Sequence, residues 1–557
     1  MKPETVAQTE TEHAVASRLH GELRRQIGLG LRQIRRFCEK NGKFDPSLMD
    51  RHQQLCYELA LTAAELSAAG AMLRYAGEWP DDELVQGIAL SFAAETYHGL
   101  IERLGIRASE MGLGAGSLTA LEQREDVRDY LDTNLSAERW EALGRTICEQ
   151  QRIRLPSSLP EEIEIVRDSF QRFADEVVEP QAERIHREDL DIPESLIKAA
   201  AELGCFGTSI PESFGGLQPD DRPDSLAMIV VTEELSRGSL GAAGSLITRP
   251  EIAARALLAG GTKKQREHWL PLLASGEKLC AISITEPDTG SDVAAVSLAA
   301  RKVEGGWLLN GGKTWCTFAG RSELLVVLAR TSRDTSLGHR GLSLLLVEKP
   351  VYSGHEFRHE QEGGGSLSGK AIATLGYRGM HSFDLFFEDY FVPEKNLVGR
   401  KAGEGKGFYY TMAGFTGGRI QTAARATGVM QAAFEQALRY AGERRVFGHA
   451  LADFQLSRVK LARMLAWLTA SRQFSYEVAR QLDAGGGQME ANLVKLFSCR
   501  AAEWLTRESM QLHGGLGYAE ESMVSRLFVD ARVLSIFEGA EETLALKVIA
   551  RQLVEEA

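Results

Sequence analysis

Apolar residues recur at helical spacing over the first part of the chain. Within residues 50–73 this spacing puts four leucines on one helix face: Leu55, Leu59, Leu66 and Leu73. The glycines of residues 112–118 interrupt the pattern, and the segment LPSSLP at residues 155–160 ends it. We therefore predict an all-helical N-terminal extension over residues 1–155.

The pattern then changes twice more along the chain. Helical spacing predicts a helical domain over residues 156–278, and it returns as a helical bundle over residues 401–557. Between them, residues 279–400 alternate apolar and polar positions and are punctuated by glycine turns, which predicts strands. This order lacks the βαβ rhythm of a dinucleotide-binding parallel sheet. The fold class predicted is therefore multidomain α+β.

Composition and charge narrow the class of protein. The chain has 557 residues, and its net charge of −13 argues against a nucleic-acid binder that relies on bulk positive charge. Its seven cysteines are dispersed without a CxxC pair, which favours a reducing compartment over a disulfide framework. The N-terminus has no long apolar run. We expect a cytoplasmic protein with no membrane segment and no metal site.

Two motifs in the predicted β region could bind a ligand. The segment ITEPDTGSD at residues 284–292 offers backbone N–H groups and the hydroxyls of Thr285 and Ser291, although turn chemistry alone also explains it. In NGGKTWCTFAG, Trp315 and Thr317 are two residues apart and are expected on one strand face. The first could cover a flat ring and the second could hydrogen-bond its edge. A core tryptophan is the alternative.

Three further motifs lie in the C-terminal helical region. Paired arginines in GERRVFGHALADFQ suit a phosphate, or else a solvated helix end. The glycines of QLHGGLGYAEE indicate a close backbone approach and do not form a Rossmann fingerprint. Glu538 follows the apolar run 533–537 and precedes Gly539. Apolar surroundings strengthen a carboxylate as a base, whereas a cap of the final helix is the simpler explanation.

The order of these motifs resembles the acyl-CoA dehydrogenase family from about Leu159 to Ala557. The resemblance rests on TEPDTGSD, NGGKTWCT, LGYRGMHSFDLFFEDYFVPEKNLVG, ERRVFG with DFQ, QLHGGLGY and FEG. It implies a helical N-terminal domain, a middle β-barrel-like domain and a C-terminal four-helix bundle, with FAD between the last two. Residues 1–155 would be an all-helical addition.

The resemblance also implies a reaction, the α,β-dehydrogenation of an acyl thioester. Glu538 matches the family base that removes the α-proton while a hydride leaves for flavin N5. The thioester carbonyl would be held by a ribityl hydroxyl and by the glutamate's own backbone N–H, as in an oxyanion hole. Some family members carry the base at the position of Gly418, which cannot act as one.

Site residues follow from the same resemblance. Those implied to contact FAD are Ile284, Thr285, Ser291, Trp315, Thr317, Arg444, Phe447, Gln455, Gln511 and Gly515. Those implied to contact substrate or to brace the catalytic loop are Ser291, Arg249, Arg419 and Gly539. Ala540 and Glu542 depart from the family, where a hydroxyl or amide is common. Electron-transfer flavoprotein is the implied electron acceptor, and a homodimer or homotetramer is the implied assembly.

The extension most resembles that of family members acting on a short, branched, dicarboxylic acyl-CoA. A buried distal carboxylate needs a partner, and Arg249 is the first candidate, with Arg237 second. Arg249 could instead face solvent or pair with a local acid.

Three other functions are alternatives on the sequence alone, and the third is disfavoured by charge. They are a dehydrogenase for another short or branched acyl-CoA, an acyl-CoA oxidase, and a flavin-containing nucleic-acid-binding relative. The last is not supported, because residues 401–557 carry 19 Lys and Arg against 17 Asp and Glu.

Overall fold

The computed structural model describes residues 3–150 and 153–557, which fold into two compact units. The first unit comprises residues 1–161, 429–481 and 486–557, and the second comprises residues 162–428 and 482–485. The long helix α13 (Gly407–Glu443) contributes to both. In the described part of the chain, no helix is both long and apolar enough to cross a membrane.

The first unit is helical and joins the extension to the C-terminal helices. The elements of the extension are α1 (Pro3–Phe37), the hairpin β1 (Glu39–Lys40) and β2 (Lys43–Phe44), α2 (Gln53–Glu78), α3 (Glu83–Gly105), α4 (Thr119–Glu122), α5 (Glu125–Leu135) and α6 (Ala137–Cys148). The C-terminal elements are α14 (Gln455–Asp483), α15 (Gln488–His513), α16 (Gly515–Tyr518), α17 (Met523–Leu534), α18 (Glu541–Thr543), the π-helix η11 (Leu544–Ala550) and α19 (Arg551–Glu556). Only the small hairpin departs from the helical prediction for the extension.

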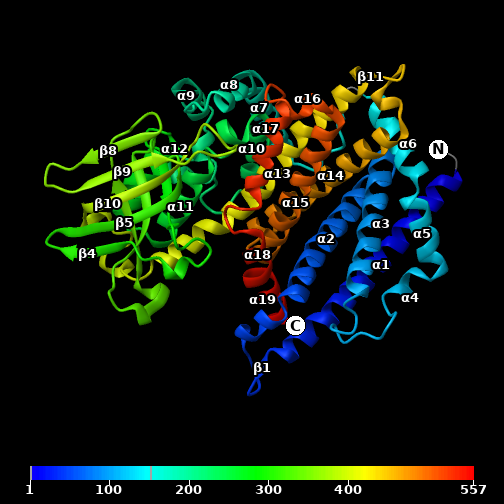
Figure 1. Ribbon diagram of the computed structural model, residues 1–557, viewed down its shortest axis with the longest axis horizontal. Helices are drawn as coiled ribbons and strands as arrows, with labels where there is room; N and C mark the ends of the chain where they lie inside the picture. The colour runs from blue at the N-terminus through cyan, green and yellow to red at the C-terminus, as the bar shows by residue number, and fades with distance from the viewer. Residues whose placement is uncertain (1–2, 151–152) are drawn as a thin grey trace. The chain divides into compact units, whose positions relative to one another are not determined.

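The extension shares one core with the C-terminal helices. Helix α2 is buried along almost its whole length and packs against α3, α15 and η11 (Figure 1). Phe92 of α3 meets the ring of Trp467 in α14 edge-on at 5.5 Å, and Trp467 stacks on Phe497 of α15 at 5.3 Å. Because Phe92 and Phe497 are buried and both pack on the partly buried Trp467, the extension is part of the unit's hydrophobic core and not a separately folded appendage.

The second unit combines helices with one mixed sheet. Its principal helices are α7 (Glu161–Phe173), α8 (Glu179–Arg187), α9 (Glu194–Glu202), α10 (Ser225–Gly238), α11 (Thr248–Gly260) and α12 (Lys263–Ala274). The strands are β3 (Cys280–Ser283), β4 (Ala299–Val303), β5 (Gly306–Thr317), β6 (Leu324–Arg330), β7 (Leu342–Glu348), β8 (Glu356–Glu360), β9 (Ser366–Ala371) and β10 (Ser382–Pro393). Their order is β3-β6-β4-β5-β10-β9-β8, with β7 also pairing with β6. Only β3–β6 and a single β4–β6 pair are parallel among these strands.

Strand alternation divides the apolar side chains of the sheet between two cores. Leu325 and Val327 of β6 belong to one core with Trp307 and Phe387, whereas Val326 and Leu328 face helices α11 and α12. Strand β6 is therefore apolar throughout, as expected for a strand covered on both faces. β10 instead alternates buried and exposed positions, because one face of it is open to solvent.

We expect Phe92→Ala to destabilise the first unit by about 3–5 kcal/mol, the usual cost of removing a buried phenylalanine. Urea unfolding of the full chain, followed by tryptophan fluorescence, measures this change. The control is Ile106→Ala in the same extension, where the side chain is 80% exposed and the change should stay within about 0.5 kcal/mol. Equal effects of the two substitutions would contradict a shared core.

Candidate functional site

The loop carrying Glu538 has an unusual backbone path. It connects α17 to α18 in the first unit. Glu538 has φ of +53° and the following Gly539 has φ of +104°, so two consecutive residues lie in the left-handed region. A side chain there costs about 1–3 kcal/mol and persists only where the surroundings enforce it. Glycine at 539 removes the second such cost.

A buried lysine enforces this path. Lys495 of α15 is 1% exposed, and its Nζ lies 2.8 Å from the carbonyl oxygen of Phe537 and 2.5 Å from that of Gly539. The ammonium therefore donates to the two carbonyls that flank Glu538. Sequence analysis missed this residue, although a lysine inside the apolar segment NLVKLF is a signal that something must satisfy it.

The extension reaches the far end of the same loop. Glu541 accepts hydrogen bonds from Tyr57 of α2 and, at 2.5 Å, from Arg500 of α15. Burial and the Glu541 carboxylate raise the pKa of the Tyr57 hydroxyl to about 12, so it stays a donor near neutral pH. Nearby, Lys547 lies 2.6 Å from Asp50 of the extension. Residues 1–155 thus buttress the segment that follows Glu538.

The second unit carries the predicted ring-binding residues on β5. Trp315 has φ of +57° and is 55% exposed. The hydroxyl of Thr317 is hydrogen-bonded to that of Ser382 of β10 at 2.9 Å. The register of β5 against β10 shifts between Phe383 and Leu385, opposite Trp315. This irregularity turns the indole outward, as β-bulges commonly do beside binding sites.

A buried ion pair fixes the loop of residues 284–298 to this strand. Lys313 Nζ lies 2.7 Å from the Ile284 carbonyl oxygen and 2.8 Å from Glu286 Oε1. Glu286 also accepts from the backbone N–H groups of Ser297 and Leu298, both at 2.8 Å. Burial acts to raise the pKa of Glu286, but Lys313 and these hydrogen bonds lower it overall. Sequence analysis overlooked both members of the pair, although both fall within the quoted motifs.

The loop positions the remaining predicted residues of the second unit. Thr285 accepts at its carbonyl a 2.9 Å hydrogen bond from the Thr314 N–H, which ties the loop directly to β5. Ser291 is exposed and Ile284 is buried. The exposed indole of Trp315 lies on the same strand as the Thr317 hydroxyl, which is paired with that of Ser382. Together with the backbone of the 284–298 loop, these groups suit a flat, electron-rich ring such as that of FAD.

The other predicted FAD contacts are exposed residues of the first unit: Arg444, Phe447, Gln455, Gln511 and Gly515. Phe447 occupies the tight turn between β11 (Arg445–Val446) and β12 (His449–Ala450) with φ of +49°, and it is 94% exposed. Gln455 Nε2 donates to Glu141 of the extension at 3.1 Å. A single exposed ring is common on protein surfaces, so the role of Phe447 in binding FAD stays a prediction.

The two arginines that could bind a distal carboxylate of the substrate differ in the partners of their guanidinium groups. Arg237 is already paired with Asp175 at 2.6 Å and with Glu234 at 2.8 Å. Arg249 is also buried, but it donates to the Ser245 carbonyl at 2.8 Å and the Tyr377 hydroxyl at 2.9 Å, and it contacts Met380 sulfur at 3.8 Å. These three hydrogen-bond partners of its guanidinium in the described structure are all uncharged.

Ser245 links Arg249 to a second buried cation. Its hydroxyl accepts a 3.1 Å hydrogen bond from Arg425 of α13, while its carbonyl binds Arg249. Two guanidinium groups therefore approach one serine in the second unit. Arg425 was not predicted, and its place in the helical segment AARATG offers no strong signal. Arg419, also on α13, is half-buried, and its bracing role stays a prediction.

Comparison with known proteins identifies the relatives of this chain. The acyl-CoA dehydrogenase N-terminal, middle and C-terminal domain models match residues 160–277, 281–390 and 405–554. The (2S)-methylsuccinyl-CoA dehydrogenase of Cereibacter sphaeroides is 45% identical over 401 residues, covering 72% of this chain and 71% of that protein.

Two solved structures are similar over 72% of this chain. One is a glutaryl-coenzyme A dehydrogenase in complex with glutaryl-CoA, with a TM-score of 0.65, 29% identity and 97% of that chain covered. The other is described as an electron transferring flavoprotein of Acidaminococcus fermentans, with a TM-score of 0.63, 28% identity and 98% of that chain covered. These comparisons confirm the predicted resemblance and fold class.

We expect Lys495→Met to retain FAD but to lower turnover about 100-fold, because a carboxylate displaced by about 1 Å costs that much. The substitution removes the Lys495 donor from two partly buried carbonyls, so stability should also fall, by about 1 kcal/mol for each lost hydrogen bond. Steady-state turnover per bound flavin and thermal unfolding measure the two effects. Lys43→Met, at an exposed lysine of the hairpin in the same unit, serves as the control, and equal losses of turnover in the two variants would refute the bracing role.

Proposed function

The chain belongs to the acyl-CoA dehydrogenase family and is an FAD-dependent oxidoreductase, and we propose that it converts methylsuccinyl-CoA to mesaconyl-CoA. The observation that carries the substrate assignment is the environment of Arg249. Burying a guanidinium among uncharged groups is costly unless an anion completes the site. A carboxylate at the far end of the acyl group supplies that anion and accepts two parallel hydrogen bonds.

The relatives support the same assignment. The (2S)-methylsuccinyl-CoA dehydrogenase and the glutaryl-CoA dehydrogenase are named for acyl groups that end in a carboxylate. Monocarboxylic acyl-CoA substrates need no cation at that end of the pocket. Arg237 is a weaker candidate because two carboxylates already neutralise it.

The residues around Glu538 account for the proton transfer. Glu538 accepts the α-proton of the thioester, and Lys495 keeps its loop in one conformation through the carbonyls on both sides. The backbone N–H of Glu538 holds the thioester oxygen, so negative charge that develops there meets a fixed donor. Bound FAD supplies the two-electron acceptor for the hydride that leaves the β-carbon. Trp315 and Thr317 line the ring.

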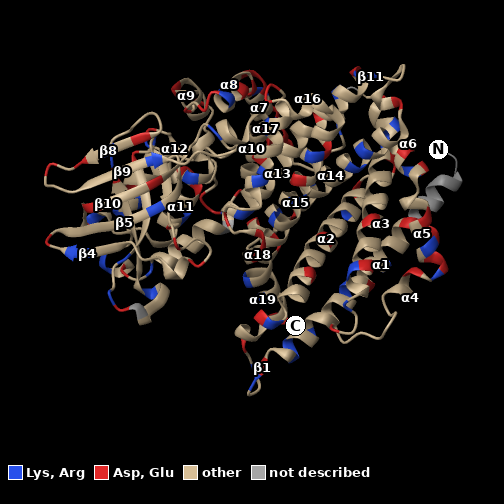
Figure 2. Cartoon of the chain, viewed as in Figure 1, with Lys and Arg blue, Asp and Glu red and all other residues tan. Residues whose placement is uncertain are grey.

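Partners and assembly complete the proposal. Electrons leave through electron-transfer flavoprotein, in keeping with the similar chain from a structure described as such. A homodimer or homotetramer would cover Phe447 and the neighbouring exposed predicted contacts. Figure 2 shows the positions of basic and acidic residues interspersed along the helices of the first unit, which gives a nucleic-acid role no support. Rapid reoxidation of the reduced flavin by oxygen alone would indicate an acyl-CoA oxidase instead.

We expect Glu538→Gln to retain FAD and lose turnover by about 10²- to 10⁴-fold, the usual contribution of a general base. The flavin spectrum checks occupancy, and single-turnover bleaching by substrate checks the chemical step. Glu542→Gln is the matched control, since this carboxylate lies four residues away on the surface and should matter little. Retention of more than about a tenth of turnover in Glu538→Gln would place the base elsewhere.

Arg249→Gln should weaken turnover of methylsuccinyl-CoA by about 10- to 1000-fold through loss of a buried charged hydrogen bond. The effect on 2-methylbutyryl-CoA, which lacks the distal carboxylate, should be small. Initial rates of flavin bleaching with both thioesters give the ratio directly. Arg237→Gln provides the comparison, because loss of a structural ion pair should lower activity equally on both. Equal losses in Arg249→Gln would assign Arg249 a structural role as well.

A further inference from the structure

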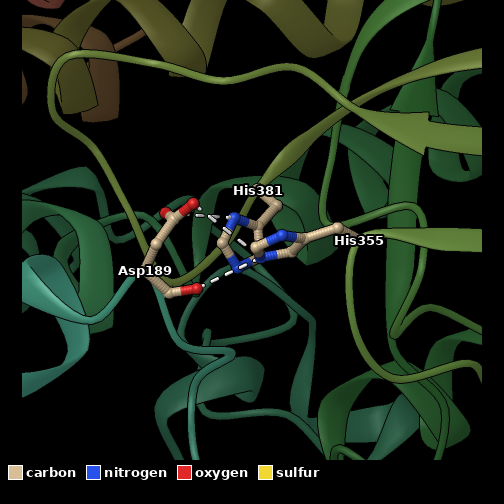
Figure 3. A group of neighbouring side chains, drawn as sticks. All are labelled: Asp189, His355 and His381. Carbon is tan, nitrogen blue, oxygen red and sulfur yellow. Dashed lines mark hydrogen bonds and ion pairs between the residues drawn. The ribbon is translucent and has the colours of Figure 1, made fainter.

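Three segments of the second unit bring imidazole and carboxylate groups together, apart from the residues assigned to the redox reaction. Asp189 lies in the loop that follows α8, His355 immediately precedes β8, and His381 immediately precedes β10. Figure 3 shows their side chains converging from these three segments. One ligand atom from each can be chosen so that all three lie within 4.8 Å of one another.

The distances match those of a cation site that is slightly expanded. His381 Nδ1 lies 3.8 Å from Asp189 Oδ1, and His355 Nε2 lies 3.9 Å from Asp189 Oδ2. Zinc bonds nitrogen and oxygen at about 2.0–2.2 Å, so ligands of a tetrahedral ion are separated by roughly 3.4 Å. A contraction of about half an ångström would close the site, and His355 sits on an exposed loop end that can supply it.

Asp191 lies beside the buried histidine. Its Oδ1 lies 3.3 Å from His381 Nε2, and the Gly354 N–H donates to its Oδ2 at 2.7 Å. His381 Nε2 makes no hydrogen bond in the described structure, and a small rotation of the ring would direct a proton on Nε2 at Asp191 and leave the lone pair of Nδ1 for a metal ion. A carboxylate on the outer nitrogen of a metal-binding histidine is the usual arrangement that fixes its tautomer.

The close approach of the two histidines also favours a bound cation. Their ring centroids are 4.4 Å apart. At this distance each ring can offer one nitrogen to a single metal ion. His355 Nε2 lies 3.1 Å from the backbone oxygen of Asp189, and a metal ion would replace the proton in that contact.

One neighbouring cation reduces the negative charge of the cluster without cancelling it. Arg378 Nε lies 3.6 Å from Asp189 Oδ1, beyond hydrogen-bond distance. Its guanidinium is held instead by the carbonyl oxygens of Thr374 at 3.2 Å and His186 at 3.0 Å. Two carboxylates, Asp189 and Asp191, therefore face one guanidinium and two imidazoles.

We propose that Asp189, His355 and His381 bind one divalent transition-metal ion, with zinc as the best match to two imidazoles and one carboxylate. Asp191 acts from the second shell through His381. The ion would tie the loop after α8 to the two strand entrances of the sheet, a structural role independent of the proposed redox chemistry. The prediction that the sequence carries no metal site would then be wrong, because the three ligands come from distant segments without a motif.

The test uses the full-length holoenzyme after dialysis against a chelator. Co²⁺ titration should produce visible ligand-field absorption that saturates at one ion per chain, and Zn²⁺ should displace it. Free Zn²⁺ at about 100 times its dissociation constant should raise the thermal unfolding midpoint by several degrees. Asp191→Asn should weaken Co²⁺ binding about 10- to 100-fold, the typical effect of removing a second-shell partner.

Single replacements distinguish this site from other histidines. His355→Asn should abolish the Co²⁺ signal while the protein stays folded, since this side chain is largely exposed. His98→Asn is the matched control, because His98 lies 2.8 Å from Glu122 and 3.7 Å from Glu102 but has no second histidine in its described surroundings. Absence of Co²⁺ binding in the wild type, or an unchanged signal in His355→Asn, would overturn the proposal and leave a histidine–aspartate ion-pair cluster.

Discussion

The hydrogen bonds from the Lys495 ammonium are the interaction on which the backbone path around Glu538 depends. The chain turns through two left-handed residues at Glu538 and Gly539, and this path is unfavourable in isolation. Lys495 makes it the stable path by binding the carbonyls on both sides. These hydrogen bonds offset the cost of burying the Lys495 cation, and they order the segment that carries the proposed base, Glu538. The extension adds a second constraint on the same loop, three residues after Glu538, where the Tyr57 hydroxyl donates a hydrogen bond to Glu541.

Three buried cations illustrate different solutions to the same desolvation problem. Lys495 is satisfied by backbone carbonyls, and Lys313 by the Glu286 carboxylate together with one carbonyl. Both lysines order loops that carry site residues. Arg249 makes three contacts with uncharged groups in the described structure. The contrast explains why Arg249, and not Arg237 with its two carboxylates, is the cation available to a charged substrate.

The extension gives this member of the family a larger helical core. Phe92 packs edge-on against the stacked rings of α14 and α15, so the helices of the extension are stabilised by the same apolar cluster as the C-terminal helices. Near the other end, Gly144 of α6 lies so close to α14 that a side-chain carbon would come within 2.2 Å of the Arg458 carbonyl oxygen. Close packing of this kind couples the extension to the segment that follows Glu538, because Tyr57, which donates to Glu541, belongs to the same set of helices.

The sequence alone determined the element types, the fold class and the family, because hydrophobic periodicity and short motifs are local properties of the chain. It also singled out Glu538, Trp315 and Arg249, since each stands out from its immediate neighbours. It could not assign Lys495 to Glu538, separate Arg249 from Arg237, or bring Asp189 to two histidines more than 160 residues away. Those relations depend on which segments pack together, and only the tertiary structure decides which buried charges already have partners.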